Sequence, residues 1–198
     1  VAIGAGSNAY NSGVAVGVRA EARGLSSAAM GRGAVAASER GVAIGGGAGA
    51  GDVYSIAVGG GADARFANSI SIGGYSKSHG AQAIAVGAQS LASGAQAISL
   101  GFSSTASGAN AIATGFGAKA TSTKEYAAGT GAQAVGGWGT AIGNNSYASG
   151  NGGSAIAIGA DAYAQSQAGG GGLNNNGAVA IGEKARAIKS SIAIGFNA

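Results

Sequence analysis

The chain has 198 residues, of which 42 are Gly, and it contains neither Pro nor Cys. The lack of Cys excludes disulfides and thiolate metal sites. Hydrophobic residues make up 46% of the chain, but many of them are Ala, which excludes a large Leu- and Phe-rich core. Charged residues make up only 9%, which excludes a strongly charged disordered chain. The net charge of +4 would suit an anionic partner, but the basic residues are dispersed, and no apolar stretch approaches the roughly 18 residues of a membrane-spanning helix.

A short phrase repeats along the whole chain, and in each copy a Gly closes an apolar triplet. From Gly17 to Gly143 the step between these glycines is always 14 residues, whereas the later steps to Gly159 and Gly182 are 16 and 23 residues. A fixed period is the signature of a solenoid with one coil per repeat. We therefore expect a single repetitive domain over residues 1–198, with regular coils over about 14–150, irregular coils and an inserted loop over about 150–180, and last coils over 180–198. The closing glycines are Gly4, Gly17, Gly31, Gly45, Gly59, Gly73, Gly87, Gly101, Gly115, Gly129, Gly143, Gly159, Gly182 and Gly195.

Within each repeat, residue types alternate with a period of two. With the closing Gly as position 0, position −2 is always Ala or Ser, and positions −3 and −1 are mostly Ile or Val. Position +3 is Ala or Ser and position +5 is almost always Ala. Period-two alternation predicts two short strands per coil, separated by Gly-rich turns. We expect positions +3 and +5 to face inward and positions +4 and +6 outward. The 18 charged residues fit this scheme, because they fall only at outward or turn positions.

The two faces of the first strand receive different predictions. We expect the large residues at −3 and −1 to fill the core of a flattened roll; among them are Ile56, Val58, Ile70, Ile72, Ile84, Val86, Ile98, Leu100, Ile156 and Ile158. A solvent-facing strand has no need of uniformly small residues at −2. We therefore expect this row to press against another copy of the chain; it includes Ala43, Ala57, Ser71, Ala85, Ser99, Ala113, Ala141 and Ala157.

Several of these phrases resemble a known family. "SIAVGGGADA" (55–64), "NSISIGGYSKSHG" (68–80), "GTAIGNNSYASG" (139–150), "SAIAIGADAYA" (154–164) and "SIAIGFNA" (191–198) are similar to the head repeats of YadA-like trimeric autotransporter adhesins, whose usual phrase is close to "NSVAIGxxSxAxG". The resemblance covers essentially the whole chain and includes the 14-residue register.

The resemblance implies an all-β fold, a left-handed parallel β-roll of which three copies assemble side by side as a homotrimer. It also implies display on the bacterial cell surface at the outer membrane, a role in virulence, and adhesion to host matrix proteins such as collagen, fibronectin or laminin. The neck, the heptad stalk and the membrane anchor of the family are not in this sequence, so membrane contact is expected only through parts outside it.

Chemistry beyond binding finds little support in the residues. Seven acidic residues and one His, spread over fourteen repeats, offer few catalytic pairs, so we expect no enzyme, no cofactor and no metal site. Arginines gather in the first third of the chain, but they are interleaved with acidic residues and lack an aromatic platform. We therefore expect a mixed-charge solvated surface and no nucleic-acid partner. The residues concerned are Arg19, Arg23, Arg32, Arg40 and Arg65, with Glu21, Glu39, Asp52 and Asp63.

The candidate ligand-binding residues lie at outward positions of the second strand. They are Lys77 and His79 in one coil, Lys119 in another, and Tyr147 and Tyr163 at position +4 of consecutive coils. Two hypotheses follow: an adhesin head that binds host molecules through this side wall, or a structural spacer rod that projects another adhesive tip. Ordinary solvated side chains also remain an interpretation of these residues, and the insert at 164–177 is either a binding loop or a tolerated surface loop.

Overall fold

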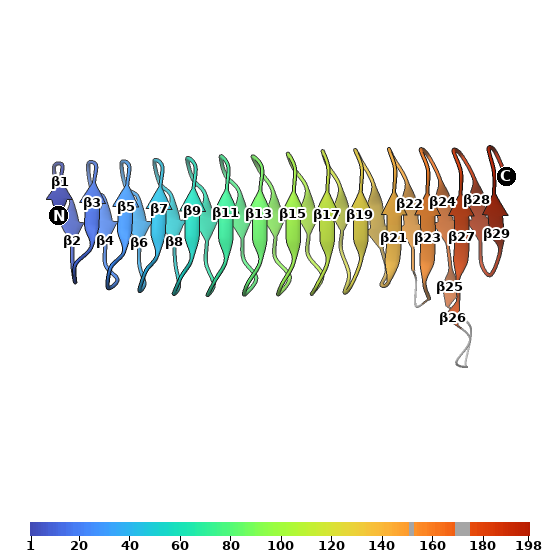
Figure 1. Ribbon diagram of the computed structural model, residues 1–198, viewed down its shortest axis with the longest axis horizontal. Coiled ribbons are helices and arrows are strands. Elements are labelled where there is room, and N and C mark those ends of the chain that lie inside the picture. Colours follow the sequence, from blue (N-terminus) through green and yellow to red (C-terminus); the bar gives the residue numbers. More distant parts are fainter. Residues whose placement is uncertain (151–152, 169–174) are drawn as a thin grey trace. The chain divides into compact units, whose positions relative to one another are not determined.

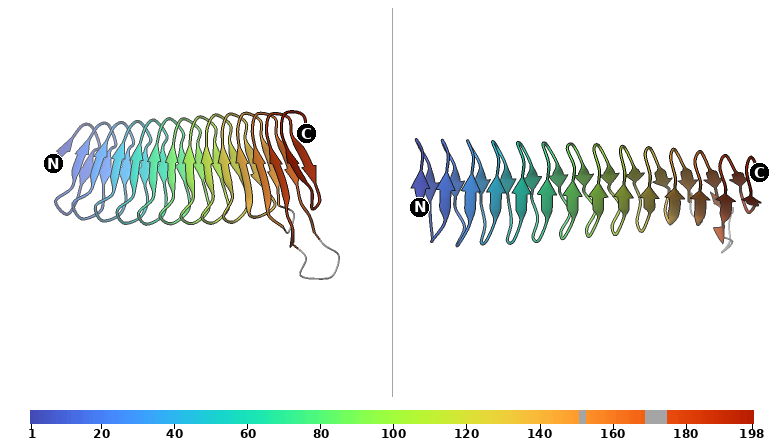
Figure 2. Two further views of the ribbon diagram at one scale, coloured as in Figure 1. Left: turned by 45° about the vertical axis from the view of Figure 1, so that its right-hand side comes forward. Right: turned by 45° about the horizontal axis from the view of Figure 1, so that its top comes forward.

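A computed structural model describes residues 1–150, 153–168 and 175–198, and it divides the chain into two compact units, Val1–Phe102 and Ser103–Ala198. Both units are β-solenoid, with coils of about 14 residues (Figure 1). Each coil contributes one strand to a sheet that we call sheet A and one strand to a sheet that we call sheet B, and the two sheets form two layers (Figure 2). Positions 0 to +2 form the AB edge, which leads from sheet A to sheet B, and positions +7 to +10 form the BA edge, which leads back.

In unit 1, sheet A holds every odd-numbered strand and sheet B every even-numbered strand. Sheet A comprises β1 (Ala2–Ile3), β3 (Val14–Val16), β5 (Ala28–Met30), β7 (Val42–Ile44), β9 (Ile56–Val58), β11 (Ile70–Ile72), β13 (Ile84–Val86) and β15 (Ile98–Leu100). Sheet B comprises β2 (Asn8–Ala9), β4 (Glu21–Ala22), β6 (Val35–Ala36), β8 (Gly49–Ala50), β10 (Asp63–Ala64), β12 (Lys77–Ser78) and β14 (Leu91–Ala92).

Unit 2 repeats this arrangement and adds a short antiparallel pair. Sheet A comprises β17 (Ile112–Thr114), β19 (Tyr126–Ala128), β21 (Gly139–Ile142), β23 (Ala155–Ile158), β27 (Ala178–Ile181) and β29 (Ile192–Ile194). Sheet B comprises β16 (Thr105–Ala106), β18 (Lys119–Ala120), β20 (Gln133–Val135), β22 (Tyr147–Ser149), β24 (Tyr163–Gln165) and β28 (Arg186–Ile188). The pair β25 (Gln167–Ala168) and β26 (Asn175–Asn176) lies in the predicted insert, and residues 169–174 between them are outside the described part.

All pairings within sheets A and B are parallel, and the register follows the repeat. Ile70, for example, pairs with Ile56 on one side and with Ile84 on the other. Equivalent residues of successive coils therefore stack into ladders about 4.8 Å apart. The predicted parallel solenoid with 14-residue coils is confirmed.

The closing Gly is required by the backbone at the start of the AB edge. Gly87 has φ +129°, and a Cβ atom there would lie 2.5 Å from the carbonyl oxygen of Gly101 in the next coil. Other side chains are excluded both by the dihedral angle and by the close approach of the neighbouring coil. This explains why the sequence repeats a Gly at this position.

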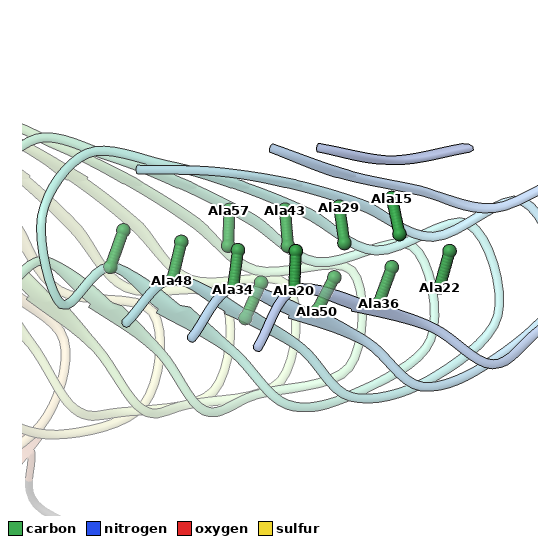
Figure 3. Close-up of a cluster of buried hydrophobic side chains, with 12 residues drawn as sticks. Ala15, Ala20, Ala22, Ala29, Ala34, Ala36, Ala43, Ala48, Ala50 and Ala57 are labelled. Atoms are coloured by element: carbon green, nitrogen blue, oxygen red, sulfur yellow. The ribbon is translucent and has the colours of Figure 1, made fainter. Parts of the chain in front are cut away.

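Between the two sheets, the interior of the roll is built from Ala and Ser. Positions −2, +3 and +5 point inward, and over residues 15–64 they form a cluster of alanines with exposures of 0 or 1%. Figure 3 shows Ala15, Ala29, Ala43 and Ala57 in one row, across from alanines of the opposite layer. The inward direction predicted for +3 and +5 is confirmed.

The prediction for position −2 is wrong. Ala43, Ala57, Ser71, Ala85, Ser99, Ala113, Ala141 and Ala157 are all 0% exposed inside the roll, so they offer no surface to another chain. The reason is the closeness of the two sheets. Ser71 lies in β11, and Ser76 lies directly before β12 in the same coil. Their hydroxyl oxygens are 2.7 Å apart. The space between the layers therefore holds only side chains the size of Ala or Ser.

The prediction for positions −3 and −1 is wrong for the same reason. Because position −2 faces inward, its two neighbours must face outward, and none of the ten predicted core residues is fully buried. Ile72 is 39% exposed and Ile158 36%, and Ile56, Val58, Ile70, Ile84, Val86, Ile98, Leu100 and Ile156 are half-buried. These side chains cover one another along the ladder and leave an apolar outer face on sheet A.

One of the charged residues predicted at outward or turn positions lies in a turn but is buried. Glu125, in the BA edge before β19, is 1% exposed. Its Oε2 accepts hydrogen bonds from the backbone N–H groups of Thr121 and Ser122, both at 2.6 Å, and its Oε1 accepts one from Gly137 at 2.7 Å. Glu125 thus ties its own turn to the turn of the next coil.

Candidate functional site

The outer face of sheet B carries the predicted ligand-binding residues. Its side chains come from positions +4 and +6, which alternate with the buried alanines at +3 and +5. Each outward residue is flanked by its equivalents in the neighbouring coils. The surface is therefore a pair of ladders whose chemistry changes from coil to coil.

In unit 1, the structure brings His79 and Lys77 together with an acidic residue of the preceding coil. Lys77 pairs in register with Asp63, and His79 donates a 2.9 Å hydrogen bond from Nε2 to the Asp63 carboxylate. Arg65 donates to the same carboxylate oxygen from Nε at 2.8 Å. Asp63 therefore holds both the imidazole and the guanidinium in fixed orientations on the face, while Lys77 is exposed beside them.

Asp63 and Arg65 were missed as members of this group because they lie in a different repeat from His79. The signal was present in the sequence. Positions +4 and +6 of consecutive coils are diagonal neighbours on a sheet face, and Asp63 and His79 occupy these two positions.

In unit 2, the other three candidates lie in a single ladder at position +4. Lys119 pairs in register with Gln133, Gln133 with Tyr147, Tyr147 with Tyr163, and Tyr163 with Arg186. This part of the ladder therefore runs from the cation Lys119 through an aromatic centre to the cation Arg186, and Thr105 precedes Lys119 in register. Arg186 was placed on the outward side of the second strand by its position four residues after Gly182, but it was not among the candidate ligand-binding residues.

The centre of this ladder is a stack. The rings of Tyr147 and Tyr163 lie 5.1 Å apart between centroids, with 11° between their planes. The guanidinium carbon of Arg186 lies 5.3 Å from the Tyr163 ring centre, and the Tyr163 hydroxyl donates a 2.8 Å hydrogen bond to Gln165. Offset stacking and cation–π contacts both stabilise this arrangement. Because the faces of the Tyr163 ring are covered, a ligand would meet ring edges, hydroxyl groups and the guanidinium.

The outer face of sheet B carries polar, charged and aromatic side chains. In the described residues, no group of three or more His, Asp or Glu side chains is placed to hold a metal ion. The described part also contains no helix able to cross a membrane. What the face offers is a set of hydrogen-bond donors, cations and aromatic edges in fixed orientations.

Comparison with known proteins agrees with the repeat geometry. The chain matches the YadA head domain repeat, taken two copies at a time, over residues 22–48, 36–62, 50–76, 67–90, 92–118 and 139–162. No curated protein matches it. The matched ranges cover more than half of the chain, and the coils that they span have the parallel register described above. The chain therefore belongs to the YadA head domain repeat family.

Proposed function

We propose that the chain is the head of a bacterial surface adhesin, displayed at the outer membrane, that binds host extracellular-matrix or cell-surface molecules through the outer face of sheet B. The observation that carries the proposal is the contrast between the two outer faces. Sheet A presents ladders of Ile and Val, whereas sheet B presents the polar and aromatic groups of Asp63, His79, Tyr147 and Tyr163. One face suits association between copies, and the other suits a hydrated ligand.

Association between copies follows from the apolar face of sheet A. Ile44 is 39% exposed and lies in register between Met30 and Val58, and Ile142 is 37% exposed and lies beside Ile158. A contiguous apolar face of this kind is unfavourable in water and marks an interaction surface. The family to which the chain belongs supports a homotrimer of left-handed rolls, in which the other copies cover this face. The apolar face thus takes over the role that the sequence alone had assigned to the small residues at −2.

Ligand binding is proposed for the clusters around Asp63 and around the tyrosine stack. Exposed Tyr and Arg side chains are the residues most often enriched at protein interfaces. In a trimer each cluster occurs three times, so weak individual contacts multiply through avidity. The proposed ligands are extended matrix proteins such as collagen, fibronectin and laminin, which offer repeated sites.

Solid-phase binding of the 198-residue chain to these three proteins tests the proposal. We expect saturable binding to at least one of them. The variant Tyr147→Ser/Tyr163→Ser should weaken it about tenfold, because the stack and the Arg186 contact are lost. The variant Lys77→Ala/Lys119→Ala should weaken it to a similar extent if the ligand is acidic at the contact.

Matched controls distinguish loss of the proposed site from loss of the same residue types elsewhere on the surface. Lys124→Ala/Lys189→Ala removes the same charge from turns outside sheet B's outer face, and Tyr75→Ser removes an exposed tyrosine from the AB edge. Both controls should bind as the wild type does. Absence of binding to all three matrix proteins would contradict the matrix proposal.

The spacer hypothesis has one observation in its favour. Several coils present small or neutral residues at position +4, among them Gly49, Leu91 and Thr105. If cell attachment of bacteria that display the full adhesin is unchanged by all of the sheet B substitutions, the spacer role is favoured over the adhesive one.

A further inference from the structure

A second surface of unit 1 has properties that the outer face of sheet B lacks. A shallow groove with a volume of about 540 Å³ runs along the AB edge, across three consecutive turns. It is lined by Val18, Arg19, Arg32, Gly33, Gly46 and Gly47. Its floor is made of glycines, so the backbone itself is accessible there.

The fold separates the arginines of this groove from every carboxylate of the unit. Residues 1–102 are all described, and within them Arg19 and Arg32 are exposed and form no ion pair. Arg23 pairs with Glu21, Arg40 with Glu39, and Arg65 with Asp63, while Asp52 accepts a hydrogen bond from the Val53 backbone. These four acidic residues lie on the outer face of sheet B or in the BA edge. Acidic and basic residues alternate in the sequence, but no acidic residue lines the groove, so the groove keeps its positive charge.

The backbone of the groove offers both donors and acceptors: within residues 1–102, the carbonyl oxygens of Arg19, Gly33 and Gly47 at position +2 accept no backbone hydrogen bond. At position +1 the carbonyl oxygens of Val18, Arg32 and Gly46 each accept a 2.9 Å hydrogen bond from the next coil. In the described residues, the N–H groups of Arg32 and Gly46 donate to no oxygen. These free N–H groups lie in the same groove as the guanidinium groups of Arg19 and Arg32, and both kinds of group are donors for an anion.

We propose that this groove binds a linear sulfated polysaccharide. Arginine guanidinium groups bind sulfate with two parallel hydrogen bonds, and the free N–H groups supply further donors to the same anions. Arg19 and Arg32 belong to consecutive coils, so they are spaced along the direction in which an extended chain would lie. The glycine floor lets the sugar rings approach without side chains in the way.

A polysaccharide fits the groove better than a single-stranded nucleic acid. Proteins that bind single strands stack bases on aromatic side chains, and no aromatic residue lines the groove. The proposal concerns a different surface from the outer face of sheet B, and it holds whether or not that face binds matrix proteins.

Binding to immobilised heparin, measured with the 198-residue chain, tests the proposal. We expect the wild type to bind heparin, to bind N- and O-desulfated heparin far more weakly, and to lose affinity as salt concentration rises. Arg19→Ala/Arg32→Ala should lower the affinity about a hundredfold, or about tenfold for each arginine. The matched control Arg23→Ala/Arg40→Ala removes the same charge outside the groove and should bind almost as the wild type does.

A second variant blocks the groove without touching the arginines. Gly46 has no positive φ, and a Cβ atom there would meet only the Arg32 carbonyl oxygen, at 3.9 Å, so substitution leaves the fold intact. Gly46→Glu should abolish heparin binding, while Gly46→Ala should preserve it. The proposal is overturned if the two arginine double variants bind heparin equally, if Gly46→Glu binds as the wild type does, or if desulfated heparin binds equally well. Tighter binding to single-stranded DNA than to heparin, with the same dependence on Arg19 and Arg32, would also overturn it in favour of a nucleic acid.

Discussion

The glycine at position 0 sets the geometry of each coil. Its φ lies near +130° throughout, for example +128° at Gly73 and +131° at Gly115. The next coil lies directly against its α-carbon, so the position tolerates no side chain. Two residues later, in contrast, Tyr75 and Gln89 adopt φ of +56° and +58°, and both residues are exposed. Similar turns thus contain one position that requires Gly and one that only favours it.

The substitution Gly87→Ala should destabilise the roll by about 3 kcal/mol or more, because it adds strain in the dihedral angle to a clash with the Gly101 backbone. The control Gly47→Ala, at φ +68° with nothing within 4 Å of a Cβ atom, should cost only about 1 kcal/mol. Urea unfolding followed by circular dichroism measures both. Equal effects would show that the contact with the next coil is unimportant.

Glu125 stabilises two turns through three backbone hydrogen bonds. Replacement by Ala leaves the N–H groups of Thr121, Ser122 and Gly137 without their acceptor and should cost about 3 kcal/mol. Glu125→Gln should cost less, because its single amide oxygen replaces one of the two carboxylate oxygens. Hydrogen exchange at these three amides should accelerate in the order wild type, Gln, Ala. The exposed control Glu39→Ala should change stability by less than about 1 kcal/mol, and unchanged exchange in Glu125→Ala would refute the role.

At the scale of the strand, the sequence predicts the alternation of faces but not which face is inside. Strand position, register and the inward direction of +3 and +5 all follow from the period of the residues. The inside of sheet A could not be predicted, because large apolar residues normally mark a core. Here the short distance between the sheets determines which face of sheet A points into the roll. This distance is set by short Gly-rich turns and by pairs such as Ser71 and Ser76. Likewise, a sequence without coordinates does not show that a BA-edge carboxylate such as Glu125 turns inward.

The structure predicts opposite outcomes for two adjacent residues of β13. Ala85→Ile places a large side chain between the sheets, where Ala85 is 0% exposed, and should cost about 3 kcal/mol or more through overpacking. Ile84→Ala shortens a half-buried side chain on the outer face and should cost the single chain about 1 kcal/mol. Thermal unfolding of both variants under conditions that prevent association measures the difference. A tolerated Ala85→Ile with an unfolded Ile84→Ala would restore the interpretation in which Ile fills the core.

At the scale of the whole molecule, we propose that the outer faces of the two sheets have different tasks. The apolar outer face of sheet A is unfavourable in water and suits association between copies. In this proposal the outer face of sheet B and the AB edge remain for ligands. The first offers hydrogen-bonding and aromatic groups, and the second offers unpaired arginines. A fold with a core of Ala and Ser gains little apolar burial within one chain, so association through Ile and Val supplies burial that the single roll lacks.

The measurement that tests this account most directly is the mass of the chain in solution by analytical ultracentrifugation at micromolar concentration. For the wild type we expect three times the chain mass of 18.2 kDa. Ile70→Lys/Ile84→Lys, which places charges on the outer face of sheet A, should give a folded monomer, and the control Lys77→Ala on sheet B should remain a trimer. A wild-type chain that is a stable monomer under these conditions would contradict the account.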